Sequence, residues 1–386
     1  MGGRTPAGAA NGGLGGSPGG TLRRCGRRPW RSTADQRPRC PFRATDLGDP
    51  IDLRRFESAS TLPSDWDDAA SSYFQQREFL AFSERFNPCR LRYYAGLEEG
   101  TVRAGAIVYT LRLDLLTFLR IPSPIPMHIV SVPVGTATPG CFGETAPRRE
   151  LLRRVTEAER GLLLTLNADP SEDLPAGTKC RLIPTILFEN QFRDWDDYLA
   201  GLRAPHRRRI RHLETAAARL VRTVGGCATF TEAHHRLYRQ VRGRAEATLE
   251  ALSCDFFRHL PDRFRLSSYH LEGRLVSWTI TVHDGTLFMY FFGGMDYACH
   301  RETRAYLVGL LNIVRTCIEE GHPRLDLGQT AAEPKLRFGG RVEPKAMYLT
   351  HHRPGIRFLL ERLGPWLEYR GEVPAFHALK TPPESP

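Results

Sequence analysis

Phe288–Phe338 carries more structural signal than any other stretch of the chain and reads FMYFFGGMDYACHRETRAYLVGLLNIVRTCIEEGHPRLDLGQTAAEPKLRF. It opens on apolar residues of strand length. A helical pattern follows over Glu302–Glu320 and stops at Gly321, after which a short apolar strand returns at Arg324–Leu327. The next residues form a loop rich in glycine and proline. Strand, helix and strand in this order predict a mixed sheet with a helix packed on its face.

The elements on either side extend the same sheet. Strands are predicted over Phe264–Glu272, Arg274–His283 and Thr286–Phe292, and Asp284-Gly285 between the last two is a strong hairpin signal. The other elements expected here are helices over Trp195–Leu202, Pro205–Val221 and Thr231–Ser253, a strand over Lys345–Thr350, and a last helix over Gly355–Leu363 that Pro365 terminates.

The first half of the chain repeats this order of elements. The predicted elements are a helix over Asp67–Phe86, strands over Arg90–Ala95, Thr101–Leu111, Leu115–Ile121 and His128–Val134, a helix over Arg148–Glu159, and strands over Leu162–Leu166 and Cys180–Phe188. No sequence identity between the halves accompanies the repeat. The pattern predicts an α/β (α+β) fold with two similar halves, residues 60–189 and 190–370, followed by a tail, residues 371–386. Each half is expected to hold a mixed, mostly antiparallel sheet flanked by helices.

The net charge of +11 is unevenly distributed over the 386 residues. Residues 1–45 hold nine arginines against the single acid Asp35, which gives +8 and leaves only +3 for the rest. Residues 1–50 are therefore predicted to be a disordered Arg/Gly-rich tail. Whole-chain charge is weak evidence for nucleic-acid binding, because most of it belongs to this tail.

Composition also sets the expected location and excludes some kinds of site. No apolar run reaches the length of a membrane span, and nine cysteines without a CxxC pair are typical of free thiols in a reducing cytoplasm. His234-His235 and His351-His352 are adjacent pairs, which do not share a helix face. We therefore expect a cytoplasmic protein with no membrane span and no metal site.

Four motifs together carry a resemblance to a known family. Met289–Ala298 (MYFFGGMDYA) is followed by Leu325–Thr330 (LDLGQT) and Glu333–Gly339 (EPKLRFG), and Trp195–Leu199 (WDDYL) lies upstream of an Arg-rich helix. This combination resembles the FemAB-like acyltransferases of the GNAT superfamily.

The resemblance implies two GNAT-like folds in tandem, with the reaction centre in the second. It also implies transfer of an acyl group to a small-molecule or peptidic amine, with acyl-CoA or aminoacyl-tRNA as co-substrate and no bound cofactor. The turn Tyr297–Arg304 departs from the pattern of ordinary acetyltransferases, because it lacks the glycines that let backbone N–H groups approach a pyrophosphate. This departure puts acetyl-CoA in doubt, but not a larger acyl donor.

Acyl transfer requires donors for the developing oxyanion and a path for the proton of the amine. Backbone N–H groups of Leu287–Phe292 are expected to face the donor carbonyl, with Tyr290 and Phe292 on that strand. Lys335 is the first side-chain candidate, as a cation for a phosphate or an oxyanion, and Arg337 is a weaker candidate of the same kind. The plain alternative for Lys335 is a solvated surface lysine.

Three further residues are candidates on position. Asp326 alternates with two leucines, so it points away from their face and could take the proton of the amine. Tyr297 and His300 precede a helix where a donor headgroup could lie, and His300 could carry a proton at neutral pH. A structural carboxylate and an exposed loop histidine are the alternatives.

The helix predicted over Pro205–Val221 is strongly basic. Arg207 and Arg211 lie four residues apart and share a face that could bind tRNA or a nucleotide-linked substrate. An ordinary solvated face explains the same pattern, because no aromatic side chains are interleaved for base stacking.

These observations leave three functional hypotheses. The first is an N-acyltransferase that uses acyl-CoA. The second is a FemAB-like aminoacyltransferase that depends on aminoacyl-tRNA. The third is a non-catalytic binding protein on a GNAT-like fold.

Overall fold

The computed structural model describes residues 51–116, 121–175, 177–244, 250–371, 373 and 376–380. The tail predicted over residues 1–50 and most of the tail predicted over 371–386 lie outside these residues. Along the described chain no helix is long and apolar enough to cross a membrane.

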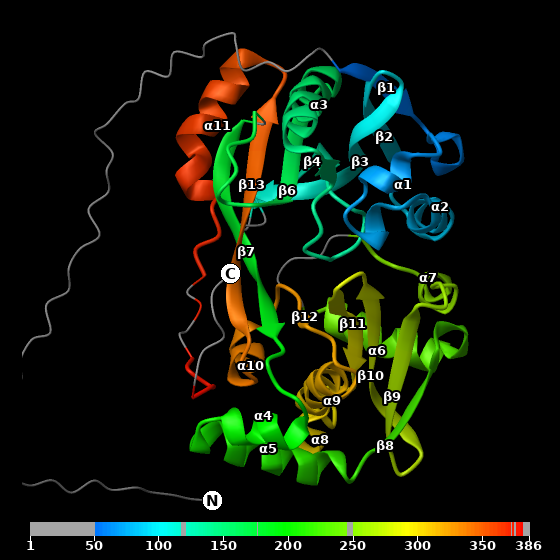
Figure 1. Cartoon of the computed structure of the whole chain (residues 1–386), viewed down its shortest axis with the longest axis vertical. Helices are drawn as coiled ribbons and strands as arrows, with labels where there is room; N and C mark the ends of the chain where they lie inside the picture. The colour runs from blue at the N-terminus through cyan, green and yellow to red at the C-terminus, as the bar shows by residue number, and fades with distance from the viewer. Residues whose placement is uncertain are drawn as a thin grey trace, which may run out of the picture. The chain divides into compact units, whose positions relative to one another are not determined.

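One sheet of thirteen strands organises the described residues (Figure 1). In chain order the strands are β1 (Asp52–Phe56), β2 (Leu91–Glu98), β3 (Thr101–Leu116), β4 (Ile121–Val130), β5 (Cys141–Gly143), β6 (Leu162–Ala168), β7 (Thr178–Glu189), β8 (Val221–Gly226), β9 (Phe264–Leu271), β10 (Arg274–Asp284), β11 (Leu287–Met295), β12 (Arg324–Asp326) and β13 (Arg341–His351). They pair in the order β1-β2-β3-β4-β6-β13-β7-β12-β11-β10-β9-β8, with β5 on β3. All neighbours are antiparallel except β4–β6 and β11–β12.

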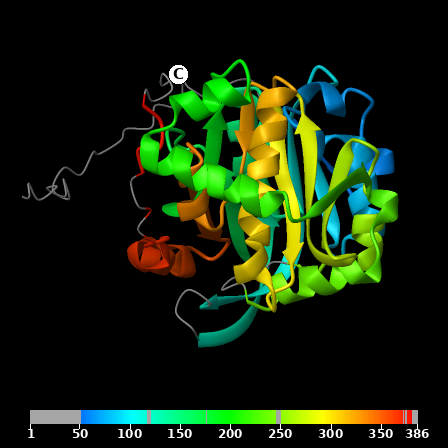
Figure 2. The same cartoon turned by 90° about the horizontal axis from the view of Figure 1, so that it is seen from below.

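Helices cover both faces of this sheet (Figure 2). The α-helices are α1 (Trp66–Ala69), α2 (Arg77–Phe86), α3 (Thr145–Ala158), α4 (Trp195–Gly201), α5 (Ala204–Ala217), α6 (Glu232–Arg242), α7 (Cys254–Arg258), α8 (His300–Thr303), α9 (Ala305–Glu319), α10 (Ala332–Arg337) and α11 (Pro354–Leu367). A short 3-10 helix, η2 (Tyr73–Gln75), precedes α2.

The two halves exchange their last strands. The strand order of the first half, β1 to β6, is completed by β13 from the end of the chain, and that of the second half, β8 to β12, is completed by β7. The exchanged strands pair with each other from Arg341↔Leu187 to Leu349↔Thr178, so they join the halves in the middle of the sheet. Figure 1 shows β7 and β13 running through both halves.

Strand register reveals a repeated residue pair that the sequence comparison does not. Arg92 lies on β2, which is two strands away from β4, and Arg265 lies on β9, which is two strands away from β11. These positions correspond, because β4 and β11 are the strands that pair in parallel with the strand after the crossover helix, α3 or α9. Each bonds the carboxylate at the C-cap of that helix: Arg92 Nε donates to Glu159 after α3 (2.9 Å), and Arg265 Nη1 donates to Glu320 after α9 (2.7 Å). The first pair is buried and the second is partly exposed.

The largest apolar core spans both halves. Phe74 of η2 stacks on Phe291 of β11, with ring centroids 5.6 Å apart, and both belong to the same buried cluster. Asp284 in the β10–β11 turn accepts hydrogen bonds from Ser72 Oγ (2.6 Å) and from Tyr73 N (2.6 Å). The β10–β11 hairpin of the second half is therefore fastened to the first half.

The predicted mixed α/β class with two similar halves is confirmed, but several element boundaries were wrong. The single helix expected over Asp67–Phe86 is divided into α1, η2 and α2, because Ser72 forms a capping box with Gln75 and starts a new helix there. Of the stretch expected as a strand over Leu115–Ile121, the first two residues end β3 and Ile121 begins β4, while residues 117–120 lie outside the described residues. The long helix expected over Thr231–Ser253 ends as α6 at Arg242.

Other corrections concern the ends of the second half. Residues 221–226 form the edge strand β8, whereas the predicted helix extended as far as Val221. The helix expected to start at Glu302 is broken at Arg304, and the loop expected around Lys335 holds the short helix α10. Pro365 does not terminate the last helix, which continues to Leu367.

Candidate functional site

Strand β11 separates from its neighbour halfway along its length. It pairs with β12 only from Leu287↔Arg324 to Met289↔Asp326 and then continues to Met295 on β10 alone. Its register with β10 shifts between Ile280↔Phe292 and Thr281↔Tyr290, so one residue of β11 is extra. Such a bulge leaves the extra residue outside the regular hydrogen-bond ladder. The second half of β11 therefore has an unpaired edge and an irregular backbone at the same place.

The bulge also turns neighbouring side chains to the same side. Phe291 and Phe292 are in edge-to-face contact at 4.7 Å, and Phe292 contacts Tyr238 of α6 with ring centroids 6.2 Å apart. Tyr290 belongs to the other side, where it packs against the cluster that contains α9. Tyr290 is half-buried, and burial raises the pKa of its hydroxyl. The two faces of β11 thus offer separate apolar walls.

Two glycines after the bulge are required by close packing. A Cβ on Gly293 would overlap the Tyr290 hydroxyl, and one on Gly294 would overlap the Trp278 indole and lie 2.9 Å from Tyr238 N. The Tyr290 and Trp278 side chains therefore occupy the space that a side chain at either glycine would need.

Arg209 of α5 and Arg304 at the start of α9 lie close to each other, and neither has a side-chain partner among the described residues. Arg304 lies at the N-cap of α9 with φ 51°, in the left-handed region that non-glycine residues rarely adopt. Burial and the charges of Arg337 and Arg304 lower the pKa of the Arg209 guanidinium. In the described part of the chain neither Arg209 nor Arg304 has a side-chain hydrogen bond or ion pair, whereas Arg337 is paired with Glu333 (2.6 Å).

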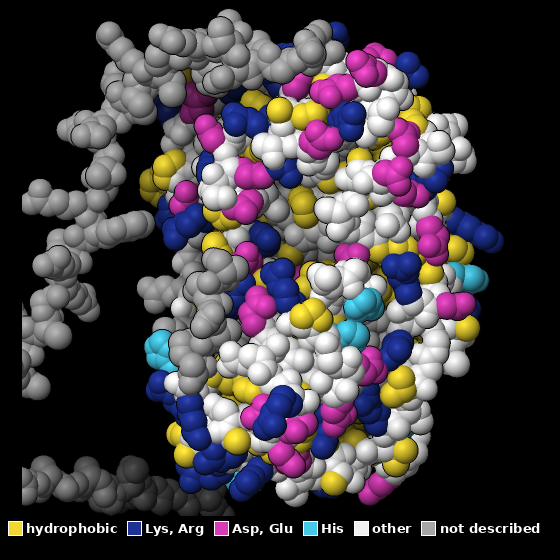
Figure 3. Space-filling model, viewed as in Figure 1, with side chains coloured by type: hydrophobic (Ala, Val, Ile, Leu, Met, Phe, Trp, Pro, Cys, Tyr) yellow, Lys and Arg dark blue, Asp and Glu magenta, His cyan; other side chains and the backbone are white. Residues whose placement is uncertain are grey.

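The helix end beside these cations adds partial positive charge. The first intrahelical bond of α9 runs from Val308 N to Arg304 O (3.0 Å). The N–H groups before Val308 therefore make no intrahelical hydrogen bond, as at any helix N-terminus. His206 of α5 is tied to this place through a contact between its Nδ1 and Arg337 O (3.2 Å). Figure 3 shows Lys and Arg side chains gathered over α4 and α5 at the lower left. The arrangement suits a phosphate-bearing ligand.

A buried carboxylate oxygen, Glu250 Oε2, belongs to the second half and influences residues of the first half electrostatically. Glu250 Oε2 is buried and has no hydrogen-bond partner, and the same is true of the Tyr109 hydroxyl of β3. Burial raises the pKa of Glu250 to about 7, while Arg242 and the amide of Asn87 act in the opposite direction. The electrostatic influence of Glu250 reaches Tyr109 and Cys89 of the first half, which places it at the junction.

Tyr238 connects the segment that contains Glu250 to β11. The Tyr238 hydroxyl accepts a hydrogen bond from Leu252 N (3.2 Å), and its ring contacts Phe292. A carboxyl group with a pKa near neutrality can act as a general base. Sequence reasoning missed Glu250, Arg209 and Arg304, because they come from separate segments and belong to no motif.

Lys335 and Asp326 lie in the interior rather than in an open groove. Lys335 Nζ donates to Gly328 O (3.1 Å) and to Thr330 O, and burial lowers its pKa to about 7. Asp326 Oδ1 accepts from Thr185 Oγ1 (2.6 Å) and from Gly328 N (2.7 Å), and burial raises its pKa. In this arrangement both side chains are buried and hold the loop between β12 and α10. Their predicted catalytic roles stay predictions.

The remaining predicted residues fall into two groups. Tyr297 and His300 lie next to each other just before α9: their rings are 5.2 Å apart, and His300 Nδ1–H donates to Tyr297 O (2.7 Å). Arg207 and Arg211 of α5 have different surroundings. Arg207 Nη1 donates to Leu202 O (3.1 Å) at the end of α4, whereas the Arg211 side chain is exposed and unpaired among the described residues.

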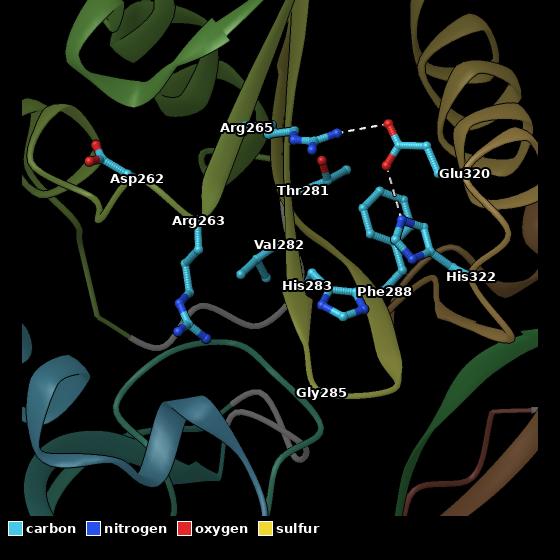
Figure 4. Close-up of a pocket in the computed structure, with 10 residues that line it drawn as sticks. All are labelled: Asp262, Arg263, Arg265, Thr281, Val282, His283, Gly285, Phe288, Glu320 and His322. Carbon is cyan, nitrogen blue, oxygen red and sulfur yellow. Dashed lines mark hydrogen bonds and ion pairs between the residues drawn. The ribbon is translucent and has the colours of Figure 1, made fainter.

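A cavity of about 460 Å³ opens near the β10–β11 turn (Figure 4). Its polar wall is a chain in which Glu320 accepts from Arg265 and pairs with His322 (3.0 Å), whose ring stacks on Phe288 at 4.6 Å. Arg265 and Glu320 are the counterparts of the buried pair Arg92–Glu159. We therefore assign this polar wall to the attachment of α9. Across the described ranges, no cluster of three His, Cys, Asp or Glu side chains has a geometry that could hold a metal ion.

One family model matches part of the second half. Residues 200–336 match the family model described as Acetyltransferase (GNAT) domain. No curated protein matches the chain significantly.

Several solved structures are similar to the chain at low identity. FemX is 11% identical, covers 80% of this chain and 100% of its own, and has a TM-score of 0.47. L-PGS from Bacillus licheniformis is 11% identical, with coverages of 74% and 96% and a TM-score of 0.46. A tandem GNAT protein from the clavulanic acid biosynthesis pathway is 13% identical, with coverages of 78% and 99% and a TM-score of 0.42. These values are too low to transfer a function to this chain.

Proposed function

We propose that the protein is an N-acyltransferase that moves an acyl group from acyl-CoA to an amine, and the match of residues 200–336 to the model of the GNAT acetyltransferase domain supports this. The observation that carries the proposal is the separation of β11 from β12 at the bulge, beside the N-terminus of α9 and its unpaired arginines. In this proposal the unpaired backbone edge of β11 and the cationic end of α9 form one site.

The two sides of β11 receive different substrates in this proposal. The donor carbonyl lies against the backbone of the bulge, where N–H groups stabilise the oxyanion of the tetrahedral intermediate. Its phosphates lie on Arg209, Arg304 and the end of α9. The amine enters from the side of Phe291 and Phe292, and Glu250 takes its proton. Collapse of the intermediate expels the thiolate and leaves an amide.

Aminoacyl-tRNA as the donor is the second candidate. The observation that favours it is α5, where Arg208, Arg209 and Arg211 are exposed next to the same site. A polyanion on this face would release counterions, so its binding would weaken steeply with salt. Neither observation identifies the amine acceptor or the acyl chain.

A donor panel tests the proposal directly. Purified protein with a set of acyl-CoAs and amines should release free thiol with one combination, and Arg209→Glu and Arg304→Glu should each raise the KM for the donor by at least tenfold while kcat changes less. Arg90→Glu, an exposed arginine on the first half, is the matched control and should behave as the wild type.

The outcome separates the donors. Activity that needs charged tRNA and disappears on RNase treatment assigns the second candidate. Inactivity with every acyl-CoA and with aminoacyl-tRNA, together with no binding of CoA, would contradict acyl transfer and leave the non-catalytic binding protein.

A further inference from the structure

The last helix touches the rest of the protein along a narrow line. α11 packs on β7 and β13, and only Leu360, Gly364 and Leu367 are buried along it. A Cβ on Gly364 would lie 2.7 Å from Thr178 Cγ2, so this line is tightly packed. The other sides of the helix face away from the sheet.

Those free sides carry an exposed apolar stripe. Ile356, Leu359, Leu363 and Trp366 follow helical spacing and are 37%, 53%, 41% and 60% exposed. Phe358, 56% exposed, lies beside them. Contiguous apolar side chains of this size on a surface mark an interaction site more often than scattered ones do.

Arginines surround the stripe. Arg353, Arg357, Arg362 and Arg370 have no carboxylate partner in the described part of the chain, and two of them lie over aromatic rings of the helix: Arg362 over Phe358 (4.8 Å) and Arg370 over Trp366 (5.2 Å). Glu361 is the only acid within α11, and Glu368 beyond it is paired with Arg181 (3.2 Å). The face is therefore both apolar and cationic.

Charge and composition decide what could cover this face. Residues 1–45 of this chain carry a net charge of +8 and few apolar side chains, so they would meet the arginines as like charges. A second copy of α11 would likewise bring arginines against arginines. An anionic lipid surface satisfies both features, since acyl chains accept Trp and Leu side chains while headgroups accept guanidinium groups.

We propose that α11 docks the protein onto anionic lipid surfaces. The helix lies flat, with its Leu360–Leu367 line on the protein and its Leu359–Trp366 stripe among the headgroups and upper acyl chains. This attachment is peripheral and reversible, because it depends on one short helix and on charge. It is independent of the acyl-transfer proposal, and neither requires the other.

Vesicle flotation with the full chain tests it. Wild-type protein should float with vesicles that contain phosphatidylglycerol and much less with pure phosphatidylcholine vesicles, and the binding should weaken in high salt. The double variant Leu359→Ser/Trp366→Ser should reduce flotation at least tenfold, because both side chains are exposed in the free protein and their loss leaves the fold intact. Arg357→Glu/Arg362→Glu should do the same.

A matched control removes exposed apolar side chains elsewhere. Val221→Ser/Val224→Ser on the edge strand β8 should float like the wild type. The basic residues 1–45 are present in every variant, so unchanged flotation of Leu359→Ser/Trp366→Ser would assign any lipid binding to them and overturn the proposal. A wild-type dimer in light scattering that this variant abolishes, without lipid binding by either protein, would overturn it in favour of a second copy.

Discussion

Glu250 shows how one buried residue can be tested for function separately from stability. Its carboxyl group has a pKa raised to about 7 by burial, so the charged form is disfavoured in the folded protein. A group whose folded pKa exceeds its unfolded value contributes stability at low pH that is lost as the pH rises through the folded pKa. A carboxylate retained here above pH 7 therefore weakens the fold, and a catalytic role would account for its presence.

Glu250→Gln should separate these effects. We expect kcat/KM to fall by about 10²- to 10⁴-fold, the usual contribution of a general base, and the rise of wild-type activity with pH around 7 to disappear. Unfolding in denaturant at pH 8 should show equal or higher stability, since the buried charge is gone. Loss of stability in parallel with activity would instead indicate a structural carboxyl group.

His234 should control the acid sensitivity of the protein. Its Nδ1 accepts from Thr231 N (3.1 Å), so Nε2 carries the hydrogen that is donated to Ser268 Oγ (2.9 Å). Burial, helped by the charge of His270, lowers the pKa of His234 to about 4. Between pH 4 and about 6.5 the unfolded chain binds the additional proton, so the free energy of unfolding rises with pH across this window.

The expected size is on the order of 3 kcal/mol between the two ends of that window. His234→Gln removes the titration and still allows a capping box with Thr231, so its free energy of unfolding should depend less on pH between 4 and 6.5. Ser268→Ala serves as the comparison: it keeps the histidine and should keep the wild-type slope. Equal slopes for His234→Gln and the wild type would refute the assignment.

At the scale of elements, the close packing of β11 against its neighbours requires glycine residues. Gly294→Ala should destabilise the protein by about 1–3 kcal/mol, because the new Cβ overlaps the Trp278 indole and the backbone of α6. Gly226→Ala, at a site with nothing within 4 Å, should be tolerated. Thermal unfolding of both variants measures the difference, and a neutral Gly294→Ala would show that α6 can move away from β11.

The elements that sequence predicted well are those with local signals. The β10–β11 hairpin was expected from Asp284-Gly285, and the structure places the turn there with Gly285 at φ 61°. The strand β8 was missed, since VRTVGG is exposed throughout and shows no apolar alternation. Pro365 was taken as a stop signal, but α11 continues for two more residues to Leu367, because one proline removes only the single N–H bond that its own residue would have made.

The candidate site was less accessible to sequence reasoning than the fold. A motif drew attention to Lys335 and Asp326, which stand close together in the chain and lie buried on either side of the loop between β12 and α10. Arg209 and Arg304 are almost a hundred residues apart and meet only after α5 and α9 pack together. Tyr109 and Glu250 come from different halves. The spacing of these residues along the sequence does not indicate which of them are close in the folded protein.

At the scale of the whole molecule, the exchange of β7 and β13 should make unfolding a single event. Each half lacks its last strand without the other, so neither should form a stable sheet alone. Residues 51–189 and 190–380 expressed separately should be insoluble or unfolded by circular dichroism, and co-expression should recover a soluble complex. Two resolved calorimetric transitions for the full chain, or a folded isolated half, would show that the exchanged strands are dispensable.

The position of β13 also bears on the order of events during synthesis. Domains ordinarily fold one after another as they leave the ribosome, the N-terminal one first. Here the first half cannot close its sheet until Arg341–His351 has been made, well after the second half has begun to emerge. The nascent chain must therefore keep the outer edge of β6 unpaired while the second half is synthesised, and chaperones that shield such edges should be found on it.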